Sequence, residues 1–249
     1  MHPHAYQLSL VCLLLTFGCG RVRHPVTVPD EVPATVPAPT QKNLTAKDAA
    51  GWKTLFDGKT LNGWEASDFF GAGKVQAKDG MLLMERGKHM TGATYTKGDF
   101  PKMDYEVTLE GKKLEGNDFF CTTTFPVGKD FCSLVVGGWS GTVVGLSSLD
   151  FMDASMNDTR TDRDFKADQW YRLRIRVSEK RIEAWLDQEK VVDQDTTDRK
   201  ISIRVECNAS TPFGIATYET TGAVRDIRVR TLNEADKKAI AELKPAKKD

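Results

Sequence analysis

The chain has 249 residues, of which 40% are hydrophobic, and this is enough for one large domain or two small ones around a buried core. Its 35 basic and 35 acidic residues balance to a formal net charge of zero. Proteins that bind nucleic acid or an anionic membrane surface normally carry a positive surplus, so no nucleic-acid partner is expected.

The N-terminal segment has the pattern of an export signal. Residues 8–17 form an apolar run that is too short to span a bilayer as a helix, and the run ends at Gly18-Cys19-Gly20. We therefore predict a signal peptide over residues 1–19 with lipoprotein-type cleavage before Cys19, whose thiol is then acylated. The protein would face the periplasm or the cell exterior, and this lipid anchor would be its only contact with the membrane.

Residues 20–49 are predicted to be an extended linker. Proline recurs at near-regular intervals from Pro25 to Pro39. Proline can neither pair in a central strand nor continue a helix, so this segment should be polyproline-like and solvated. A proline-rich stretch can also be a peptide ligand, but a spacer is the simpler account directly after a lipid anchor.

From Trp52 onward the sequence alternates with the period of a β-strand. In residues 171–177 leucine, isoleucine and valine fall on one face and three arginines fall on the other. Residues 182–187 continue the apolar face after a short polar turn and place two carboxylates and Trp185 on the polar face. This pattern predicts a β-hairpin whose outer face carries cross-strand ion pairs.

Further strands are predicted at intervals typical of an all-β sandwich, separated by loops that hold Gly, Asp, Asn or Pro. They cover residues 105–109, 119–125, 131–136, 142–146, 201–206, 213–218 and 223–232. The fold class is therefore all-β, a two-sheet antiparallel jelly-roll sandwich over residues 50–232. The tail of residues 233–249 begins with a short helix, which opens on the capping residue Asn233 and ends near residue 243.

Three cysteines remain in the body of the chain, Cys121, Cys132 and Cys207. None belongs to a CxxC pair or clusters with histidine at metal-ligand spacing, so a structural zinc site is not expected. Cys121 and Cys132 can bridge adjacent strands in an oxidising compartment, or all three can be buried free thiols.

Residues 51–64, GWKTLFDGKTLNGW, are similar to the opening signature of the 3-keto-disaccharide hydrolase domain family. Weaker similarities follow in residues 104–110, 170–176, 182–187 and 214–229. The resemblance implies a concanavalin-like sandwich that cleaves glycosides already oxidised at C3. In such sugars the ketone acidifies the C2 proton, so a base can remove it and the C1 substituent leaves.

The chain departs from the family pattern at several polar positions. Asn117-Asp118-Phe119 stands where many members have Asn-Ser-Gly, and residues 144–150 keep only the final aspartate of a glutamate, glutamine and aspartate set. Thr217-Tyr218-Glu219 replaces a segment of the Gln-Asp-His type. The resemblance therefore transfers the fold more safely than the catalytic residues.

Three residues are candidates for the catalytic base. Glu110 matches the family's strand glutamate, Asp150 matches its aspartate, and His89 is the one histidine of the body. The alternatives are an exposed edge carboxylate, a turn-forming aspartate and an idle loop histidine. Together with the nearby Asp153, Asp150 could instead hold a hard cation such as calcium, but no cofactor follows with certainty from the sequence.

The candidates for substrate binding are Trp139, Asp153 and Asn117. Trp139 lies between glycines after a strand, which suits an aromatic platform for a sugar, although packing in the core is equally open. Asn117 and Asp153 offer polar groups in loops next to segments that resemble the family. Trp52 and Trp64 belong to the opening signature and are predicted to be buried.

Two functions are therefore weighed. The first is an envelope glycoside hydrolase or lyase that acts on 3-keto-glycosides by proton abstraction and cleavage at C1. The second is a non-catalytic carbohydrate-binding or adhesion module, because the same fold serves both roles. The sequence has no GxSxG elbow, P-loop or HExxH motif, so it does not support a serine hydrolase, nucleotide-binding or zinc-protease function.

Overall fold

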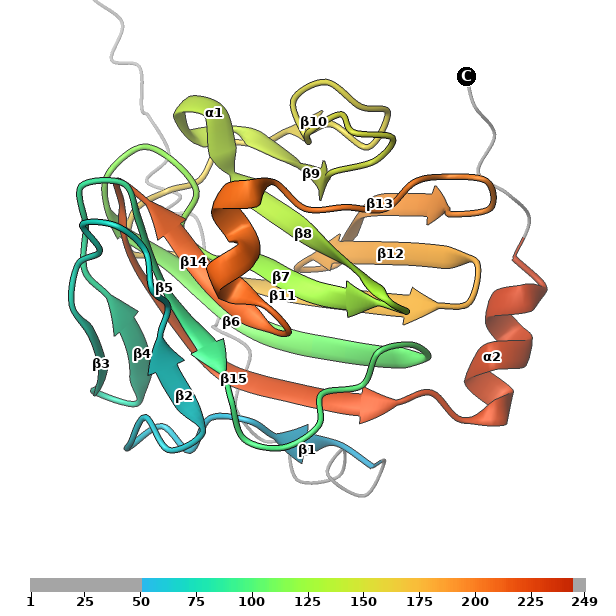
Figure 1. The fold of residues 1–249 in the computed structure, drawn as a ribbon, viewed down its shortest axis with the longest axis horizontal. Helices are drawn as coiled ribbons and strands as arrows, with labels where there is room; N and C mark the ends of the chain where they lie inside the picture. Colours follow the sequence, from blue (N-terminus) through green and yellow to red (C-terminus); the bar gives the residue numbers. More distant parts are fainter. Residues whose placement is uncertain (1–50, 244–249) are drawn as a thin grey trace, which may run out of the picture. The chain divides into compact units, whose positions relative to one another are not determined.

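The computed structural model describes residues 51–243. The predicted signal peptide, Cys19 and the predicted linker lie outside the described residues. Residues 51–243 fold as a sandwich of two antiparallel β-sheets with a short C-terminal helix (Figure 1), which confirms the predicted fold class.

The first layer, sheet A, has eight strands. Its long central strands include the two strands of the predicted hairpin. In spatial order the strands are β13 (Glu189–Asp195), β12 (Arg181–Leu186), β11 (Trp170–Ser178), β6 (Tyr105–Glu115), β15 (Thr221–Thr231), β4 (Met81–Met84) and β3 (Val75–Lys78), and β1 (Lys53–Thr54) pairs with β15 off this path. The pair of short strands, β3 and β4, forms one edge of the sheet.

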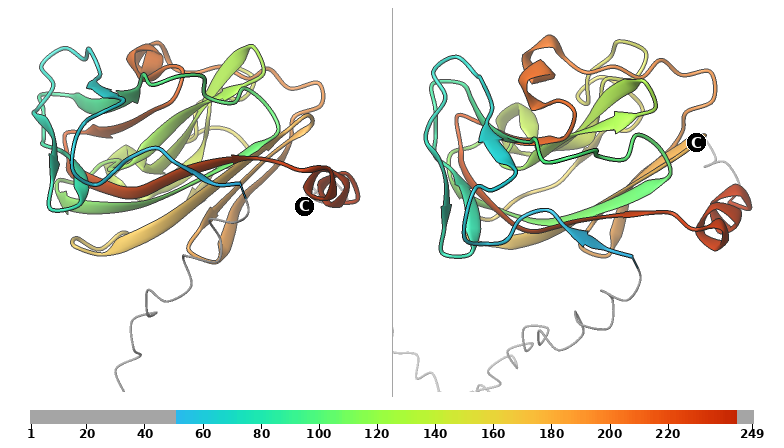
Figure 2. Two further views of the ribbon diagram at one scale, coloured as in Figure 1. Left: turned by 90° about the horizontal axis from the view of Figure 1, so that it is seen from below. Right: turned by 60° about the horizontal axis from the view of Figure 1, so that its bottom comes forward.

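The second layer, sheet B, has seven strands. In spatial order they are β10 (Thr161–Asp162), β9 (Val143–Ser147), β8 (Asp130–Gly137), β7 (Thr122–Val127), β14 (Gly214–Tyr218), β5 (Met90–Tyr95) and β2 (Trp64–Ala66). A tight turn, α1 (Gly138–Gly141), joins β8 to β9, and a 3-10 helix, η3 (Val205–Ser210), lies on the outer side of this sheet (Figure 2).

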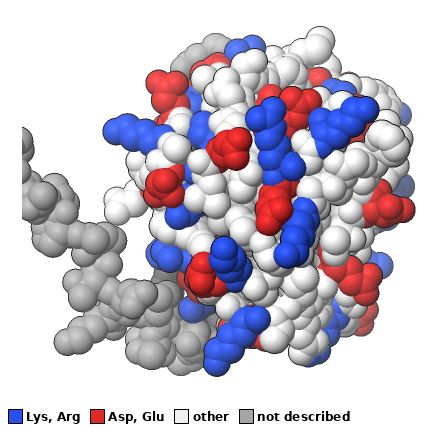
Figure 3. Space-filling view, turned by 90° about the vertical axis from the view of Figure 1, so that its left-hand side faces the viewer, with Lys and Arg blue, Asp and Glu red and all other residues white. Residues whose placement is uncertain are grey.

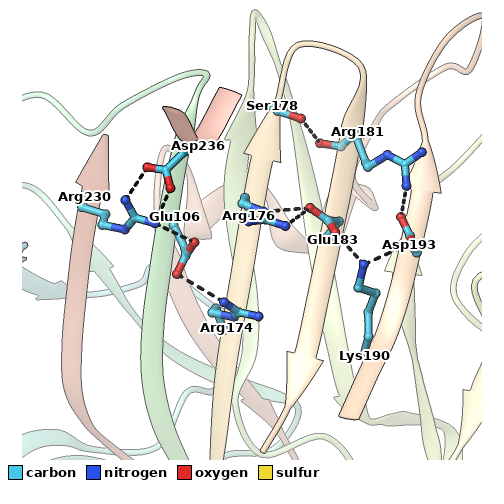
Figure 4. Close-up of polar contacts among 10 residues, drawn as sticks. All are labelled: Glu106, Arg174, Arg176, Ser178, Arg181, Glu183, Lys190, Asp193, Arg230 and Asp236. Carbon is cyan, nitrogen blue, oxygen red and sulfur yellow. Dashed lines mark hydrogen bonds and ion pairs between the residues drawn. The ribbon is translucent and has the colours of Figure 1, made fainter. Parts of the chain in front are cut away.

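The hairpin of β11 and β12 has the predicted register, with Ile175 opposite Ala184 on the core face. On the outer face the Arg174 guanidinium lies 3.6 Å from the centre of the Trp185 ring. Glu183 is only 1% exposed and accepts hydrogen bonds of 2.7 Å from Arg176 and from Lys190. The alternation seen in the sequence therefore produces an ionic ladder across the outer face of sheet A (Figure 4).

The core fills the space between the two sheets. Large aromatic side chains such as Tyr105, Phe120 and Phe213 are completely buried there. Trp64 is buried as predicted, and its indole N–H donates to the Leu55 carbonyl at 2.9 Å. The prediction was wrong for Trp52, which is only half-buried; one side of its ring is covered by the Arg230 guanidinium, 5.3 Å from the ring centre.

Another prediction fails between residues 201 and 206. Ile201, Ile203 and Val205 alternate as in a strand, but only Ile201 forms a β-bridge, to Leu149. Val205 is 76% exposed and begins η3 instead. The alternation is broken because the backbone turns away from sheet B to cover its outer face.

The C-terminal helix, α2 (Glu234–Ala241), begins as predicted at Asn233. The Asn233 side chain accepts from the Asp236 amide at 2.9 Å, and the Asp236 carboxylate accepts from the Asn233 amide at 3.1 Å, which is a complete capping box. Asp236 also forms a 2.6 Å ion pair with Arg230 of β15 and so ties the helix to sheet A (Figure 4).

The distribution of charge on the surface agrees with the equal numbers of basic and acidic residues. Basic and acidic side chains are interspersed on the face drawn in Figure 3. Cys121, Cys132 and Cys207 are buried free thiols. Between residues 51 and 243, none of the helices combines the length and the apolar character needed to cross a bilayer.

Candidate functional site, a cleft on the outer face of sheet B

A cleft of about 820 Å³ lies between the outer face of sheet B and η3. Because side chains alternate along a strand, β7, β8 and β9 turn Thr122, Ser133 and Ser147 toward this cleft while their neighbours enter the core. The Thr122 hydroxyl is buried and has no hydrogen-bond partner within residues 51–243. The floor is therefore lined with hydroxyl groups from three adjacent strands.

Cys207 of η3 also lines the cleft, where it is 8% exposed. Burial is the main cause that raises the pKa of its thiol above the ordinary value. A protonated thiol is a weak nucleophile, so Cys207 serves here as a small apolar wall.

Aromatic side chains form much of the remaining wall and rim. Phe119 and Tyr218 pack against each other with ring centres 5.7 Å apart, and both are partly buried. At the rim, Phe70 is 81% exposed, Val205 is 76% exposed and Trp139 is 39% exposed. Exposed apolar and aromatic side chains grouped around one hollow are typical of a ligand site.

Trp139 reaches the rim from a turn with unusual backbone angles. Trp139 has a φ of 46° and Ser140 has a φ of 70°, a left-handed conformation that costs energy for residues other than glycine. One oxygen of the Asp118 carboxylate accepts from the Ser140 amide at 3.1 Å, and the other accepts from the Phe119 amide at 2.8 Å. Asp118 therefore holds the turn against the loop that precedes β7.

A histidine and a carboxylate form a pair at another wall. His89 Nδ1 lies 3.6 Å from Glu219 Oε1, and the imidazole stacks on Tyr218 with ring centres 6.1 Å apart. The Glu219 amide also donates to the His89 carbonyl at 2.9 Å, which links the two backbones. Nδ1 is therefore the imidazole nitrogen that faces Glu219.

Arg204 occupies the side of the cleft formed by the segment before η3. Its guanidinium forms 3.0 Å ion pairs with Glu206 and with Asp153. The hydrogen bond to Glu206 is the largest cause that raises the pKa of Arg204. The predicted binding residue Asp153 thus reaches the cleft only through Arg204, because it does not line the cleft itself.

Of the predicted site residues, the structure brings His89 and Trp139 to the cleft. Glu110 lies on the opposite layer, since its neighbour Leu109 is buried in the core and Glu110 turns to the outer face of sheet A. There Arg172 and Arg225 donate to its two oxygens, each at 2.9 Å. Burial acts to raise the pKa of Glu110, but these two guanidinium groups outweigh it and hold the pKa below its ordinary value.

Asp150 also lies away from the cleft, in the loop after β9. It accepts from the Lys200 amide at 2.8 Å and pairs with Arg199 at 2.6 Å. The bond from Lys200 is the largest cause that lowers the pKa of Asp150. The catalytic roles suggested for Glu110 and Asp150 stay predictions, and neither residue has a place in the cleft.

Asn117 is exposed and packs beside the Trp139 turn rather than into the cleft. A Cβ atom on Gly141, whose φ is 104°, would lie 2.8 Å from Asn117 Oδ1, so this close approach requires glycine. No group of three or more His, Cys, Asp or Glu side chains within residues 51–243 is arranged to hold a metal ion. The suggested calcium site stays a prediction.

The sequence did not single out Asp118, Glu219 or Arg204. Asp118 and Glu219 stand in two of the segments that depart from the family pattern, so those departures were the available signal. Arg204 carried no signal, because it was assigned to a strand that does not form.

A sequence profile described as the 3-keto-alpha-glucoside-1,2-lyase-like domain matches residues 51–230. No curated protein matches the chain. Many solved structures share the fold at low sequence identity.

A Crh5 transglycosylase solved in complex with NAG is 16% identical, with a TM-score of 0.52, over 76% of this chain and 87% of that chain. The carbohydrate-binding module CBM66 from Bacillus subtilis is 12% identical, with a TM-score of 0.45, over 68% and 96% of the two chains. A β-1,3-1,4-glucanase (lichenase) derived from a mouse hindgut metagenome is 12% identical, with a TM-score of 0.46, over 73% and 98%. At 16% identity, the similarity to the Crh5 transglycosylase supports the fold alone. The profile match spans most of the chain and agrees with the signature at residues 51–64, so the chain belongs to the 3-keto-α-glucoside-1,2-lyase-like domain family.

Proposed function

We propose that the chain cleaves 3-keto-glycosides in the cleft on sheet B, with His89 as the base and Glu219 as the residue that orients it. The observation that carries this proposal is the 3.6 Å pair of His89 and Glu219 at the wall of an aromatic cleft. Membership of a lyase-like family supplies the substrate class.

The proposed reaction is an elimination that returns its proton. His89 Nε2 removes the C2 proton, and the electron pair of the C2–H bond passes into an enolate on the C3 oxygen. The enolate then reforms the ketone, a C1=C2 double bond forms and the C1–O bond breaks. The imidazolium gives the same proton to the departing oxygen, so the products are an unsaturated keto-sugar and the free alcohol. Addition of water at C1 completes a net hydrolysis.

The surrounding residues have supporting tasks in this proposal. Glu219 keeps Nδ1 protonated and stabilises the imidazolium that forms in the first step. Trp139 and Phe70 provide aromatic faces at the rim that can contact the substrate. The hydroxyl groups of the floor offer partners for the oxygen atoms of the sugar.

The proposal is tested by following product formation from 3-keto-trehalose and from phenyl 3-keto-α-glucoside by mass spectrometry. The substitution His89→Gln should lower kcat/KM by roughly 100- to 10,000-fold, which is the usual contribution of a general base. Glu219→Gln should lower kcat by about 10- to 100-fold with little change in KM. Glu110→Gln should behave like the unmodified protein. Loss of activity in Glu110→Gln but not in His89→Gln would reverse the assignment.

A non-catalytic carbohydrate-binding module is the second candidate. Two carboxylates at the cleft are already engaged and are therefore poorly placed to act as a catalytic base, which favours this function. Asp118 accepts two backbone amides, and Glu206 is paired with Arg204. Saturable binding of a glycoside that depends on Trp139, with no turnover of either keto-sugar, would support this function over the first.

We also propose that the protein is exported and anchored through Cys19. This rests on the apolar run and the Gly18-Cys19 pair in the sequence.

A further inference from the structure

We propose that the cleft is built for a glycoside with one sugar ring and an apolar, preferably aromatic, aglycone rather than for a disaccharide. The proposal deepens the function proposed above and rests on it for the identity of the sugar ring.

The rim of the cleft is apolar. Phe70, Val205 and Trp139 are exposed large hydrophobic side chains, and all three surround this cleft. Phe69 and Phe119 continue the apolar surface inward. Such a surface gains free energy by covering an apolar group and gains little by covering hydroxyl groups, which remain better hydrated in water.

Two of the charged side chains at the cleft, Asp118 and Arg204, already have partners. Both oxygens of Asp118 accept backbone amides, and Arg204 is held between Asp153 and Glu206. A second pyranose ring brings several hydroxyl groups that must each replace a hydrogen bond to water. Asp118 and Arg204 could bind those hydroxyl groups only in competition with the partners that they already have.

Polar capacity remains at the floor of the cleft. The buried Thr122 hydroxyl lacks a partner within residues 51–243, and Ser147 lies on the same floor, whereas Ser133 Oγ already shares a hydrogen bond of 2.8 Å with Thr124 Oγ1. His89 faces the same cleft, so one ring can be bound through polar contacts at the floor and at this wall. A site with a polar floor and an apolar rim matches a molecule with one polar and one apolar end.

The position of Phe70 agrees with this division. The Lys88 amide donates to the Gly71 carbonyl at 2.8 Å, which brings the Phe70 loop beside the segment that carries His89. The Lys88 ammonium lies 5.7 Å from the centre of the Phe70 ring. The exposed ring therefore lies beside Lys88, the residue before the proposed base, and lines the same cleft as that base.

The test is a binding measurement that needs no chemistry. Isothermal titration of the whole chain compares phenyl α-D-glucoside, methyl α-D-glucoside and trehalose, none of which carries a C3 ketone. The expected result is that phenyl glucoside binds at least about tenfold more tightly than the other two, because a buried apolar group of this size gives discrimination of that order. Equal or tighter binding of trehalose overturns the proposal, as does no measurable binding of phenyl glucoside at millimolar concentration.

Matched variants show whether the cleft is responsible. Phe70→Ser and Val205→Ser should each reduce the preference for the phenyl group several-fold. Phe151→Ser is the control, because Phe151 is 74% exposed but lies outside the cleft. An equal loss in Phe70→Ser and Phe151→Ser would indicate adhesion to any exposed ring and would overturn the proposal.

The same probes separate this proposal from the proposed function. If both keto-sugars are cleaved equally well while phenyl glucoside shows no preference in binding, the function holds and the aglycone preference is wrong. If phenyl glucoside is preferred and neither keto-sugar is cleaved, the ligand class holds and the catalytic proposal is wrong.

Discussion

Asp118 Oδ2 accepts a hydrogen bond of 3.1 Å from the backbone amide of Ser140, and this bond joins two loops at the rim of the cleft. Ser140 directly follows Trp139, and both residues have left-handed backbone angles. The bond therefore helps to offset the strain of the conformation that presents the indole ring.

Replacing Asp118 with alanine should weaken sugar binding more than it weakens the fold. Loss of the two accepted bonds should reduce the free energy of unfolding by about 1–3 kcal/mol. Because Trp139 loses its fixed position, KM for a cleaved glycoside should rise several-fold while kcat changes less. Asp150→Ala is the matched control, since Asp150 also accepts a backbone amide, from Lys200 at 2.8 Å, but lies outside the cleft. An unchanged KM in Asp118→Ala would contradict this role.

Asp57, which belongs to the opening signature, should make the free energy of unfolding depend on pH in acid. Hydrogen bonds from the Thr60 amide and hydroxyl and from the Lys59 amide lower the pKa of Asp57 to about 2. The pKa in the unfolded chain is higher, about 3.9, so the charged form stabilises the fold above that pH. This contribution should be lost as the pH falls from about 4 to 2. Asp57→Asn should flatten the urea-unfolding free energy over this window, and parallel curves for the two proteins would count against the assignment.

Breaking the buried ion pairs of sheet A should be costly. Glu183 is 1% exposed and pairs with Arg176 and Lys190, so Glu183→Gln leaves two cations without their shared partner. We expect the free energy of unfolding to fall by about 2–4 kcal/mol, somewhat below the full cost of breaking a buried pair because the two cations are partly exposed.

Glu189 provides the control for this measurement. It pairs with Arg163 at 3.2 Å, but its side chain is 69% exposed. Glu189→Gln should cost less than about 1 kcal/mol in urea unfolding. Similar losses in the two variants would mean that burial does not set the strength of these pairs.

The proposed anchor can be tested in a bacterial host that acylates lipoproteins. The unmodified chain should incorporate an azide-labelled fatty acid and fractionate with membranes. Cys19→Ala should abolish the label and release the protein, whereas Cys12→Ala should retain both properties. A label that persists in Cys19→Ala would exclude Cys19 as the acylated residue.

The sequence was a good guide wherever the pattern was local. Alternation in residues 171–187 predicted the hairpin of β11 and β12, and Asn233 predicted the start of α2. Both depend on neighbours within a few residues, so no knowledge of the sheet order was needed.

The cleft could not be predicted in the same way, because its residues come from loops and strands far apart in the chain. Glu110 illustrates the difficulty. Its strand was predicted over residues 105–109 and in fact extends to Glu115, but only the sheet order shows that Glu110 faces away from the layer that carries His89. Val205 illustrates a second difficulty, because it belongs to a segment that alternates like a strand but begins the 3-10 helix η3, which covers the cleft.

Strand β15 pairs with β6 and β4 along its two edges and also with β1, yet it is the last strand in chain order within residues 51–243. Without β15, sheet A falls into three pieces, namely the four strands from β13 to β6, the pair of β4 and β3, and the single strand β1, so β6 and β4 are left with bare edges. Such edges readily pair with other chains, so we expect the chain to be prone to aggregation until β15 has docked between β6 and β4. A chaperone that shields β4 and β6 until then should raise the yield of folded protein.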